Sequence, residues 1–201
     1  MNTTPRLRPG RQKLSRDEVR VHQSKRIFTA LEKVMSEKGY LGTSVADIIK
    51  AAGVSRQTFY QLFTSKQDCF VASYTRRQDS LIANIVDHVT GDTPMERFAR
   101  VLRAYLTSMA VDPGRSRLYL IGVYAAGPEA IAHRLRLQEQ FVDAMAGVFA
   151  ATTEQDRFNC RAVIAAVSTM VTTALLDDDA DAVLALYDPV FAMTGRIMAS
   201  G

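Results

Sequence analysis

The 201-residue sequence predicts an all-α protein of about nine helices. Apolar residues recur at three- and four-residue spacing along most of the chain, which is the pattern of helices with one buried face. Glycine, proline and capping patterns divide this periodic sequence into segments. No segment shows the sustained two-residue alternation that is typical of a half-buried strand. With 47% apolar residues, the chain is able to bury a substantial core.

The first expected helix covers about residues 17–38 and ends at Gly39. Ile27, Leu31 and Val34 belong to a single apolar stripe along it. This pattern predicts a helix that packs with one face on the rest of its domain.

The second and third expected helices are short and are separated by a glycine turn. Ser44 and Asp47 have the spacing of a capping box, so a helix begins there. Gly53 can adopt the left-handed conformation that ends this helix, and Ser55 caps the next one, which directs Phe59 inward. Two short helices joined in this way have the dimensions of a helix-turn-helix.

The rest of the sequence predicts a long fourth helix and five more. A capping pattern at Ser65 opens a fourth helix that reaches about His88. Pro189 should bend or interrupt the final helix, because proline cannot donate a backbone hydrogen bond. The five remaining helices are expected at about residues 94–111, 115–126, 128–151, 154–176 and 180–199.

Charge is distributed unevenly along the chain. Residues 1–66 contain 13 Lys and Arg against 5 Asp and Glu, a net charge of +8. Residues 67–201 contain 12 Arg against 16 Asp and Glu, a net charge of −4. This asymmetry indicates that the first part meets a polyanion while the second has another task.

The segment from Thr43 to Lys66, TSVADIIKAAGVSRQTFYQLFTSK, resembles the DNA-binding signature of the TetR family. The resemblance covers about residues 20–72, while the rest of the chain is similar to that family only in length and helical character. Ile49 and Gln57 depart from the family's pattern. The matching positions include Gly53, Val54, Ser55, Thr58, Tyr60, Phe63 and Lys66.

The resemblance implies a transcriptional repressor that binds a palindromic operator as a dimer and is released by a small-molecule effector. It divides the chain into a basic flexible arm at 1–16, a helix-turn-helix DNA-binding domain at 17–66, and a helical effector-binding and dimerisation domain at 67–201. The alternative is an architectural or activator protein that binds DNA without a small-molecule effector.

The third helix and the starts of the helices on either side of it supply the residues expected to contact DNA. Arg56 and Gln57 can make paired hydrogen bonds to base edges, arginine to guanine and glutamine to adenine. Thr43, Ser44 and Lys66 lie at helix starts, which favour phosphate contacts. Tyr60 and Lys66 also fit ordinary surface positions. The candidate DNA-binding residues are Thr43, Ser44, Ser55, Arg56, Gln57, Thr58, Tyr60, Gln61 and Lys66.

Ahead of the first helix, Arg8 and Arg11 lie in a basic segment that resembles an arm for an A·T-rich minor groove. A solvated tail that adds only sequence-independent affinity explains the same residues equally well.

The larger domain contains aromatic and methionine residues that can line an adaptable pocket, although such residues are more often plain core. His133, Arg134 and Arg103 can add polar contacts or face solvent. We therefore expect a mostly apolar or aromatic effector. The candidate ligand-binding residues are Tyr105, Met109, Tyr119, Tyr124, Phe141, Met145, Phe149 and Met170.

The last two helices are apolar around more of their circumference than a surface helix needs. Two such helices from each subunit can form a four-helix interface, as the family resemblance also implies. We therefore expect a homodimer, since one recognition helix contacts only a few base pairs.

Other classes of function find little support. The sequence has no phosphate-binding glycine loop, Gly-x-Ser-x-Gly or His-Glu-x-x-His motif, so we do not expect an enzyme. Cys69 and Cys160 lack metal-ligand spacing and should be reduced and buried, and we expect no metal or cofactor. Without a long uninterrupted apolar run or a signal peptide, the sequence predicts a cytoplasmic protein without a membrane partner.

Overall fold

The computed structural model describes residues 15–177 and 179–199, and these residues form ten α-helices, two short 3₁₀ helices and no strand. The predicted all-α class is therefore confirmed. The helices are α1 (Arg16–Lys38), α2 (Val45–Ala52), α3 (Arg56–Leu62), α4 (Lys66–Val86), α5 (Pro94–Ala110), α6 (Pro113–Leu120), η1 (Gly122–Ala126), α7 (Pro128–Phe149), α8 (Glu154–Ala174), η2 (Leu175–Asp177), α9 (Ala180–Ala185) and α10 (Tyr187–Ala199).

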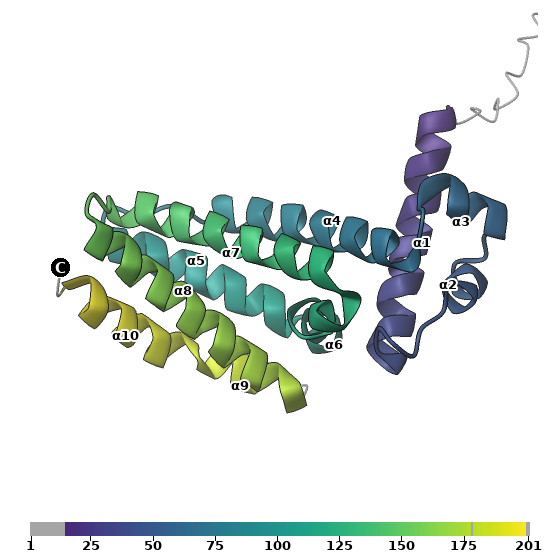
Figure 1. Cartoon of the computed structure of the whole chain (residues 1–201). Coiled ribbons are helices and arrows are strands. Elements are labelled where there is room, and N and C mark those ends of the chain that lie inside the picture. Colours follow the sequence, from purple (N-terminus) through teal and green to yellow (C-terminus); the bar gives the residue numbers. More distant parts are fainter. Residues whose placement is uncertain (1–14, 178, 200–201) are drawn as a thin grey trace, which may run out of the picture.

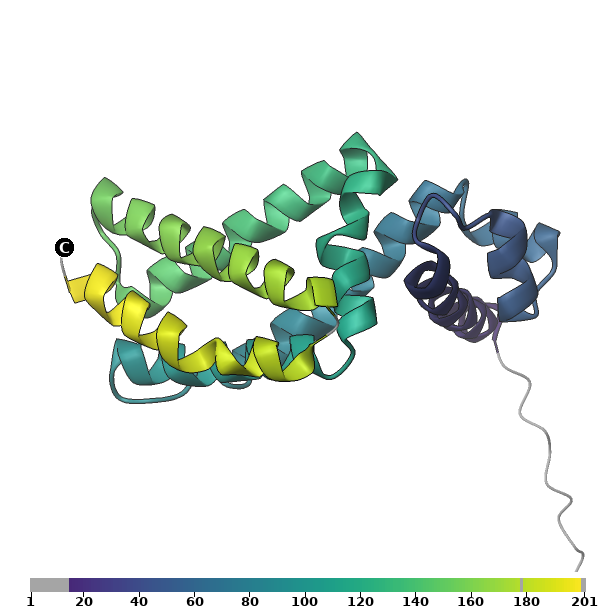
Figure 2. The same ribbon diagram turned by 90° about the horizontal axis from the view of Figure 1, so that it is seen from below.

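The molecule is elongated, with α1–α3 at one end and a helical bundle at the other (Figure 1). Helix α4 leaves the α1–α3 group and continues into the bundle, where it lies beside α5 and α7. Helix α6 and η1 lie at the end of the bundle nearest α1, as the view from below also shows (Figure 2). This arrangement places α4 and α6 between the two parts of the molecule.

Two predicted helices are each divided in the structure. The segment expected as one helix at 115–126 forms α6 and then η1, with Ile121 between them. The final expected helix, 180–199, is interrupted at Leu186 and forms α9 and α10. Pro189 accounts for this break, because it has no N–H to donate to the carbonyl of Ala185 four residues earlier. The predicted interruption by Pro189 is thus confirmed.

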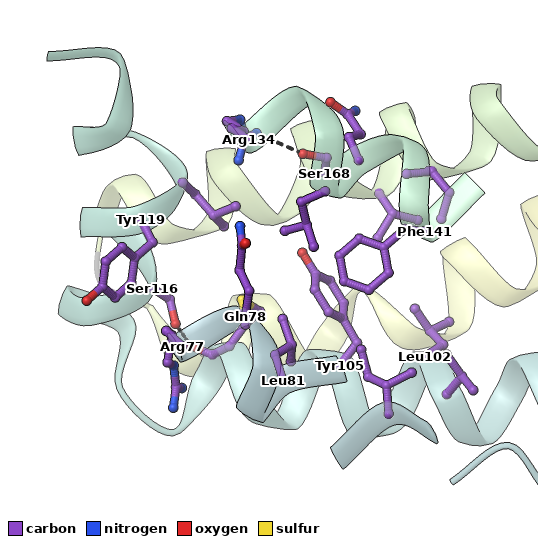
Figure 3. A pocket seen from close by; sticks show the side chains of 18 of the residues that line it. Arg77, Gln78, Leu81, Leu102, Tyr105, Ser116, Tyr119, Arg134, Phe141 and Ser168 are labelled. Carbon is purple, nitrogen blue, oxygen red and sulfur yellow. Dashed lines mark hydrogen bonds between the residues drawn. The ribbon is translucent and has the colours of Figure 1, made fainter. Parts of the chain in front are cut away.

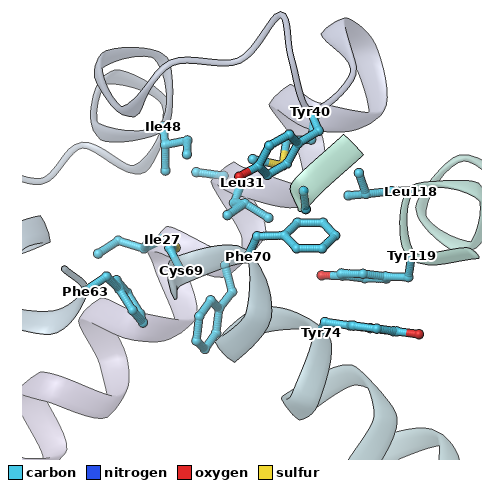
Figure 4. Packing of buried hydrophobic residues seen from close by; sticks show 14 of the residues in the cluster. Ile27, Leu31, Tyr40, Ile48, Phe63, Cys69, Phe70, Tyr74, Leu118 and Tyr119 are labelled. Carbon is cyan, nitrogen blue, oxygen red and sulfur yellow. The ribbon is translucent and has the colours of Figure 1, made fainter. Parts of the chain in front are cut away.

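A first cluster of buried residues holds α1, α2, α3 and the start of α4 together and extends to α6 and α7 (Figure 4). Phe70 of α4 is fully buried and meets the ring of Tyr40 edge-on, with centroids 5.4 Å apart. Tyr74 of α4 stacks on Tyr119 of α6 at 5.2 Å. The N-terminal core is therefore continuous with residues beyond position 66, so α6 packs directly on the helix-turn-helix part.

A second cluster fills the bundle formed by α5 and α7–α10. Cys160 of α8 is fully buried in this cluster, and Cys69 of α4 is fully buried in the first. Both thiols are free, as expected. Burial raises the pKa of each thiol above its ordinary value, which keeps both protonated and unreactive near neutral pH.

Two stretches within the described residues, Glu154–Asp177 and Ala180–Ala199, have the length and apolar composition of a membrane-crossing helix. Only 28% and 17% of their most apolar windows is buried in a single chain. Core and interface helices of proteins that cross no membrane meet the same test. Most residues in the apolar windows of these two stretches are therefore not buried within a single chain.

Candidate nucleic-acid interface and cavity

Helices α2 and α3 form the predicted helix-turn-helix, and local capping fixes where each begins. The Ser44 hydroxyl accepts a hydrogen bond from the Asp47 N–H, and the Asp47 carboxylate accepts one from the Ser44 N–H at 2.9 Å. The Ser44 hydroxyl also donates to Asp47 Oδ2 at 2.6 Å, and this bond, the Lys38 ammonium at 2.9 Å and the Ser44 N–H lower the pKa of Asp47 well below its usual range. Gly53 adopts the left-handed conformation (φ 60°) and ends α2, and the Ser55 hydroxyl accepts from the Thr58 N–H to begin α3.

Arg26 of α1 holds the turn between these two helices. Its Nη2 donates to the carbonyl oxygens of Ala52 and Gly53 at 2.7 and 3.0 Å. Carbonyls at a helix C-terminus lack partners within the helix and carry partial negative charge, so a guanidinium there is favourable. A cation on α1 therefore caps α2 and fixes the direction in which the chain enters α3.

The outer face of α3 is exposed and rigidly supported. Phe59 is fully buried beneath it, whereas Arg56, Gln57 and Gln61 face solvent. Tyr60 is 45% exposed, and the Arg56 guanidinium lies over its ring at 5.5 Å. The side chains expected to reach bases thus stand at the exposed N-terminal end of a helix whose opposite face is held by the core.

Lys66 and Thr43 are tied together at the start of α4. The Lys66 ammonium donates to the carbonyl oxygens of Tyr40 and Thr43, each at 2.8 Å, and lies 4.2 Å from the centroid of the Tyr40 ring. The Thr43 side chain is buried, and its hydroxyl donates to the Gly39 carbonyl at 2.8 Å. Lys66 therefore clamps the loop before α2, and at most one of its three ammonium hydrogens remains to meet a phosphate.

The remaining predicted DNA contacts have mixed surroundings. The Ser55 and Thr58 hydroxyls form a hydrogen bond at 2.9 Å, with Thr58 half-buried and Ser55 exposed. Ser44 is exposed next to its capping partner. Arg8 and Arg11 lie outside the described residues.

The bundle encloses an apolar cavity of about 130 Å³ between α4, α5, α6, α7 and α8 (Figure 3). Four of the eight predicted ligand-binding residues line it, namely Tyr105, Met109, Tyr119 and Phe141. Burial raises the pKa of the Tyr105 hydroxyl to about 12, which keeps it neutral at physiological pH. A small, mostly hydrocarbon ligand suits a cavity of this size and lining.

The other four predicted ligand residues do not line the cavity. Met145 is buried in the bundle core and Phe149 packs on Phe98 with ring centroids 6.0 Å apart. Met170 packs against the same core, and Tyr124 is 56% exposed on η1. Helical periodicity identifies buried residues, but it does not distinguish those that face an internal space from those that face another side chain.

A hydrogen-bonded network joins the cavity wall to α1. The Tyr119 hydroxyl donates to Glu32 Oε1 of α1 at 2.8 Å and lies 2.7 Å from the Ser73 hydroxyl of α4. Arg115 of α6 adds an ion pair to Glu32 Oε2 at 3.5 Å and one to Asp112 at 2.8 Å. Burial and the nearby Glu32 carboxylate raise the pKa of Tyr119 far above its ordinary value. A residue that lines the cavity thus contacts the helix that supports the helix-turn-helix.

Sequence reasoning did not find this network or the Arg26 cap. Glu32 and Arg26 lie on the polar side of α1, where charged residues are expected to face solvent. Their partners are 87 and 26 residues away in sequence, so no local pattern indicates the pairing.

Comparison with known proteins identifies the N-terminal part. The family model for bacterial regulatory proteins of the tetR family matches residues 27–72. HTH-type transcriptional regulator EthR of Mycolicibacterium smegmatis is 28% identical over 129 residues, which cover 63% of this chain and 55% of EthR. HTH-type transcriptional activator FasR of the same organism is 26% identical over 134 residues, which cover 66% of this chain and 59% of FasR. The matches thus span less than two thirds of either relative.

Solved structures share the fold over most of the chain. FadR from Bacillus subtilis, in complex with stearoyl-CoA, has a TM-score of 0.75 at 20% identity and covers 85% of this chain and 96% of its own. The fatty acid degradation regulator FadR from Bacillus halodurans has a TM-score of 0.77 at 17% identity, with coverages of 91% and 96%. Residues 27–72 thus match the family model of tetR-type bacterial regulatory proteins, and the chain as a whole shares the fold of these solved regulators.

Proposed function

We propose that this chain is a repressor that binds a palindromic DNA operator as a homodimer and releases it when a small molecule fills the bundle cavity. The single observation that carries the proposal is the exposed N-terminal face of α3, where Arg56 and Gln57 stand on a helix fixed by the buried Phe59. Arginine and glutamine at this place on a recognition helix suit guanine and adenine edges in the major groove.

Backbone contacts would set the position of the dimer on DNA. Ser44 and Ser55 lie at the starts of α2 and α3, and Tyr60 and Gln61 border the base-contacting residues. Helix N-termini and hydroxyl groups favour phosphate oxygens. The basic arm at 1–16 would add affinity through the minor groove or through phosphates alone. Both parts would supply the salt-dependent share of binding.

The dimer would form through the last two helices of each subunit. Phe158 of α8 is 61% exposed and Leu184 of α9 is 44% exposed in the single chain. Partner helices would cover such apolar side chains in a four-helix interface. The two recognition helices would then lie about 34–36 Å apart, which matches successive major grooves on one side of the duplex.

Release would follow from a shift between two conformations. A ligand in the cavity contacts Tyr119, and Tyr119 contacts Glu32 of α1. If the ligand is better accommodated when α6 and α4 move relative to α1, the spacing of the recognition helices changes and operator affinity falls. In this proposal residues 17–66 bind DNA and residues 67–201 bind the effector and form the dimer, while the first hydrophobic cluster joins the two parts across residue 66.

Known relatives support an effector that is largely apolar. The FadR structure from Bacillus subtilis holds stearoyl-CoA, a ligand with a long hydrocarbon chain. The cavity here is lined mainly by hydrocarbon side chains.

We place the protein in the cytoplasm, where it would meet the operator DNA.

Transcriptional activation is the second candidate. FasR, one of the relatives, is named an activator. The same surface of α3 would bind DNA in either case, so the two differ in output and not in DNA recognition.

Selection of bound sequences from a randomised duplex library, with the full chain, tests the proposal. We expect a two-fold symmetric consensus and, by fluorescence anisotropy at near-physiological salt, an affinity at least about a thousandfold above that for a scrambled duplex. Sedimentation equilibrium should give a dimer. A monomer, or equal affinity for both duplexes, would contradict the proposal. Transcription in vitro from a promoter with the selected site would separate repression from activation.

A further inference from the structure

The cavity is long and narrow. Its lining extends along α4 from Tyr74 to Ile85 and along α5 from Phe98 to Met109. Each of these segments is about 16 Å long at a rise of about 1.5 Å per residue. A cavity of about 130 Å³ lined over such a length suits an elongated ligand.

The two ends of the cavity differ in polarity. Arg77, Ser116 and Arg134 lie toward α6, the end nearest the helix-turn-helix part (Figure 3). Leu102 and Phe141 lie toward the opposite end, and Gln78 lies at about the same position along the cavity as Arg134. This gradient fits an amphiphile whose polar head is directed toward α6.

The polar end favours a negative charge. The lining includes two arginines, Arg77 and Arg134, and no Asp or Glu. Arg134 is held in place by hydrogen bonds from Nη2 to the Ser168 hydroxyl at 3.0 Å and from Nε to the Tyr124 hydroxyl at 3.2 Å. The charge of Arg77 also interacts with the Glu32 and Asp112 carboxylates outside the lining, so Arg134 is the cation that attracts an anionic group and disfavours a cationic one, and low polarity nearby strengthens both effects.

Gln78 presents an unpartnered amide nitrogen to this space. The side chain is 6% exposed, and its Nε2 has no hydrogen-bond partner within the described residues. Burial raises the pKa of Tyr74, and the nearby Gln78 amide partly offsets that rise. The Tyr74 hydroxyl nevertheless lies outside hydrogen-bonding geometry with Gln78 Nε2. An unsatisfied buried N–H is costly, so an acceptor on a ligand would gain from meeting it.

Neighbouring side chains fix the direction of this amide. Arg136 can only donate, so its Nη2, 3.4 Å from His133 Nδ1, makes Nδ1 the acceptor. The proton on His133 therefore resides on Nε2, which lies 2.8 Å from Gln78 Oε1 and 3.2 Å from the Thr75 hydroxyl. Thr75 donates its own hydrogen to the Val71 carbonyl, so its oxygen also accepts. His133 is thus a positioning residue that holds Oε1 of Gln78 and leaves the NH₂ group for the cavity.

On the basis of the proposed function, in which this cavity is the effector site, we propose that the effector is an unbranched aliphatic carboxylate whose carboxylate accepts a hydrogen bond from Gln78 beside Arg134. The distance along α4 from Gln78 to Ile85 is about 10 Å. An extended chain advances about 1.2 Å per bond, so a chain of about six to ten carbons fills the apolar end.

Isothermal titration calorimetry of the full chain with octanoate, octan-1-ol and octylamine tests this proposal. These probes share a chain length and differ only in the head group. Octanoate should bind at least about tenfold more tightly than either of the others, because a hydrogen bond to a charged group contributes about that factor or more. Equal binding of the alcohol or the amine, or no binding of octanoate, would overturn the proposal.

Two substitutions assign the head group to Gln78. Gln78→Leu should weaken the binding of octanoate about tenfold. Gln140→Leu, the same change on the exposed face of α7, should leave the affinity for octanoate unchanged. Gln78→Glu keeps the shape of the side chain and should reverse the head-group preference, so that octylamine binds more tightly than octanoate. This second variant tests the contact if the leucine variant fails to fold. Unchanged octanoate binding in the folded variants would exclude Gln78 as the contact.

Operator affinity, measured with and without octanoate, separates this proposal from the proposed function. If octanoate binds through Gln78 but leaves operator affinity unchanged, the ligand class is correct and the release mechanism is wrong. If operator binding is specific but octanoate does not bind, the DNA-binding proposal stands and the ligand class is rejected.

Discussion

The Tyr119 hydroxyl offers the sharpest test of how the two parts of the molecule are joined. Tyr119→Phe keeps the ring that stacks on Tyr74 and removes one oxygen. Because the hydroxyl has one hydrogen, donated to Glu32 at 2.8 Å, the Ser73 hydroxyl must be the donor in the 2.7 Å bond to Tyr119. Ser73 can turn its hydrogen to a carbonyl one helical turn earlier, whereas Glu32 loses a short charge-assisted bond.

The expected cost follows from that asymmetry. A hydrogen bond to a charged group contributes about 1.5–3 kcal/mol. The Glu32 side chain is 20% exposed and retains Arg115 at 3.5 Å, so partial compensation places the loss near 2 kcal/mol. For a chain of this size, that loss corresponds to a decrease in Tm of about 4–8 °C.

A matched control is available on η1. Tyr124 is 56% exposed, and its hydroxyl accepts a hydrogen bond from Arg134 Nε at 3.2 Å. Tyr124→Phe is therefore the same chemical change at a solvated position and should cost less than about 0.5 kcal/mol. Urea unfolding monitored by circular dichroism measures both variants. Equal losses, or no loss in Tyr119→Phe, would refute the assignment of stability to the contact with Glu32.

Four further results are expected. Arg26→Met should lower stability by about 1–2 kcal/mol in urea unfolding because two carbonyls at the end of α2 lose their donor, while Arg20→Met on the same helix should have little effect. Gln57→Ala should weaken binding to the selected operator about tenfold in anisotropy titrations and leave binding to scrambled DNA unchanged. Equal weakening of both would indicate that Gln57 contacts a phosphate and not a base. Cys69 should react with a thiol reagent only at the rate of unfolding, and rapid labelling of native protein would contradict its burial. Burial holds the pKa of His133 below 6.5, so the unfolded chain binds the proton first and stability should fall as pH decreases through that value; His133→Gln should reduce this dependence.

The sequence was informative where structure depends on neighbours along the chain. Ser44, Asp47 and Gly53 determine the ends of α2 through contacts within a few residues, and the predicted boundaries are confirmed. The interruption near Pro189 follows from the proline ring alone. For the same reason the exposed face of α3 was predictable, because a short helix with Phe59 inside must present Arg56 outside.

The sequence was uninformative where residues far apart meet. Nothing in the periodicity of α1 distinguishes Glu32 from a solvated glutamate, yet it accepts a hydrogen bond from Tyr119. Aromatic content identified Tyr105 and Phe141 together with Met145, but only the first two face the cavity. An internal space depends on how helices are spaced, and helix spacing is a property of the whole bundle.

The polar end of the cavity and the contact between the two parts of the molecule share the same helix. Ser116 and Tyr119 of α6 line the cavity, and Arg115 and Tyr119 of the same helix contact Glu32 of α1. A ligand head group near Gln78 would therefore act next to the contact that fixes α1, whereas its hydrocarbon chain would lie among residues that make no contact with α1 in this network. The hydrocarbon chain of the ligand would supply binding energy. The position of the head group would decide whether ligand binding changes the arrangement of the helix-turn-helix. Two ligands with the same hydrocarbon chain and different head groups are thus expected to differ in their effect on DNA affinity as well as in their own affinity for the protein.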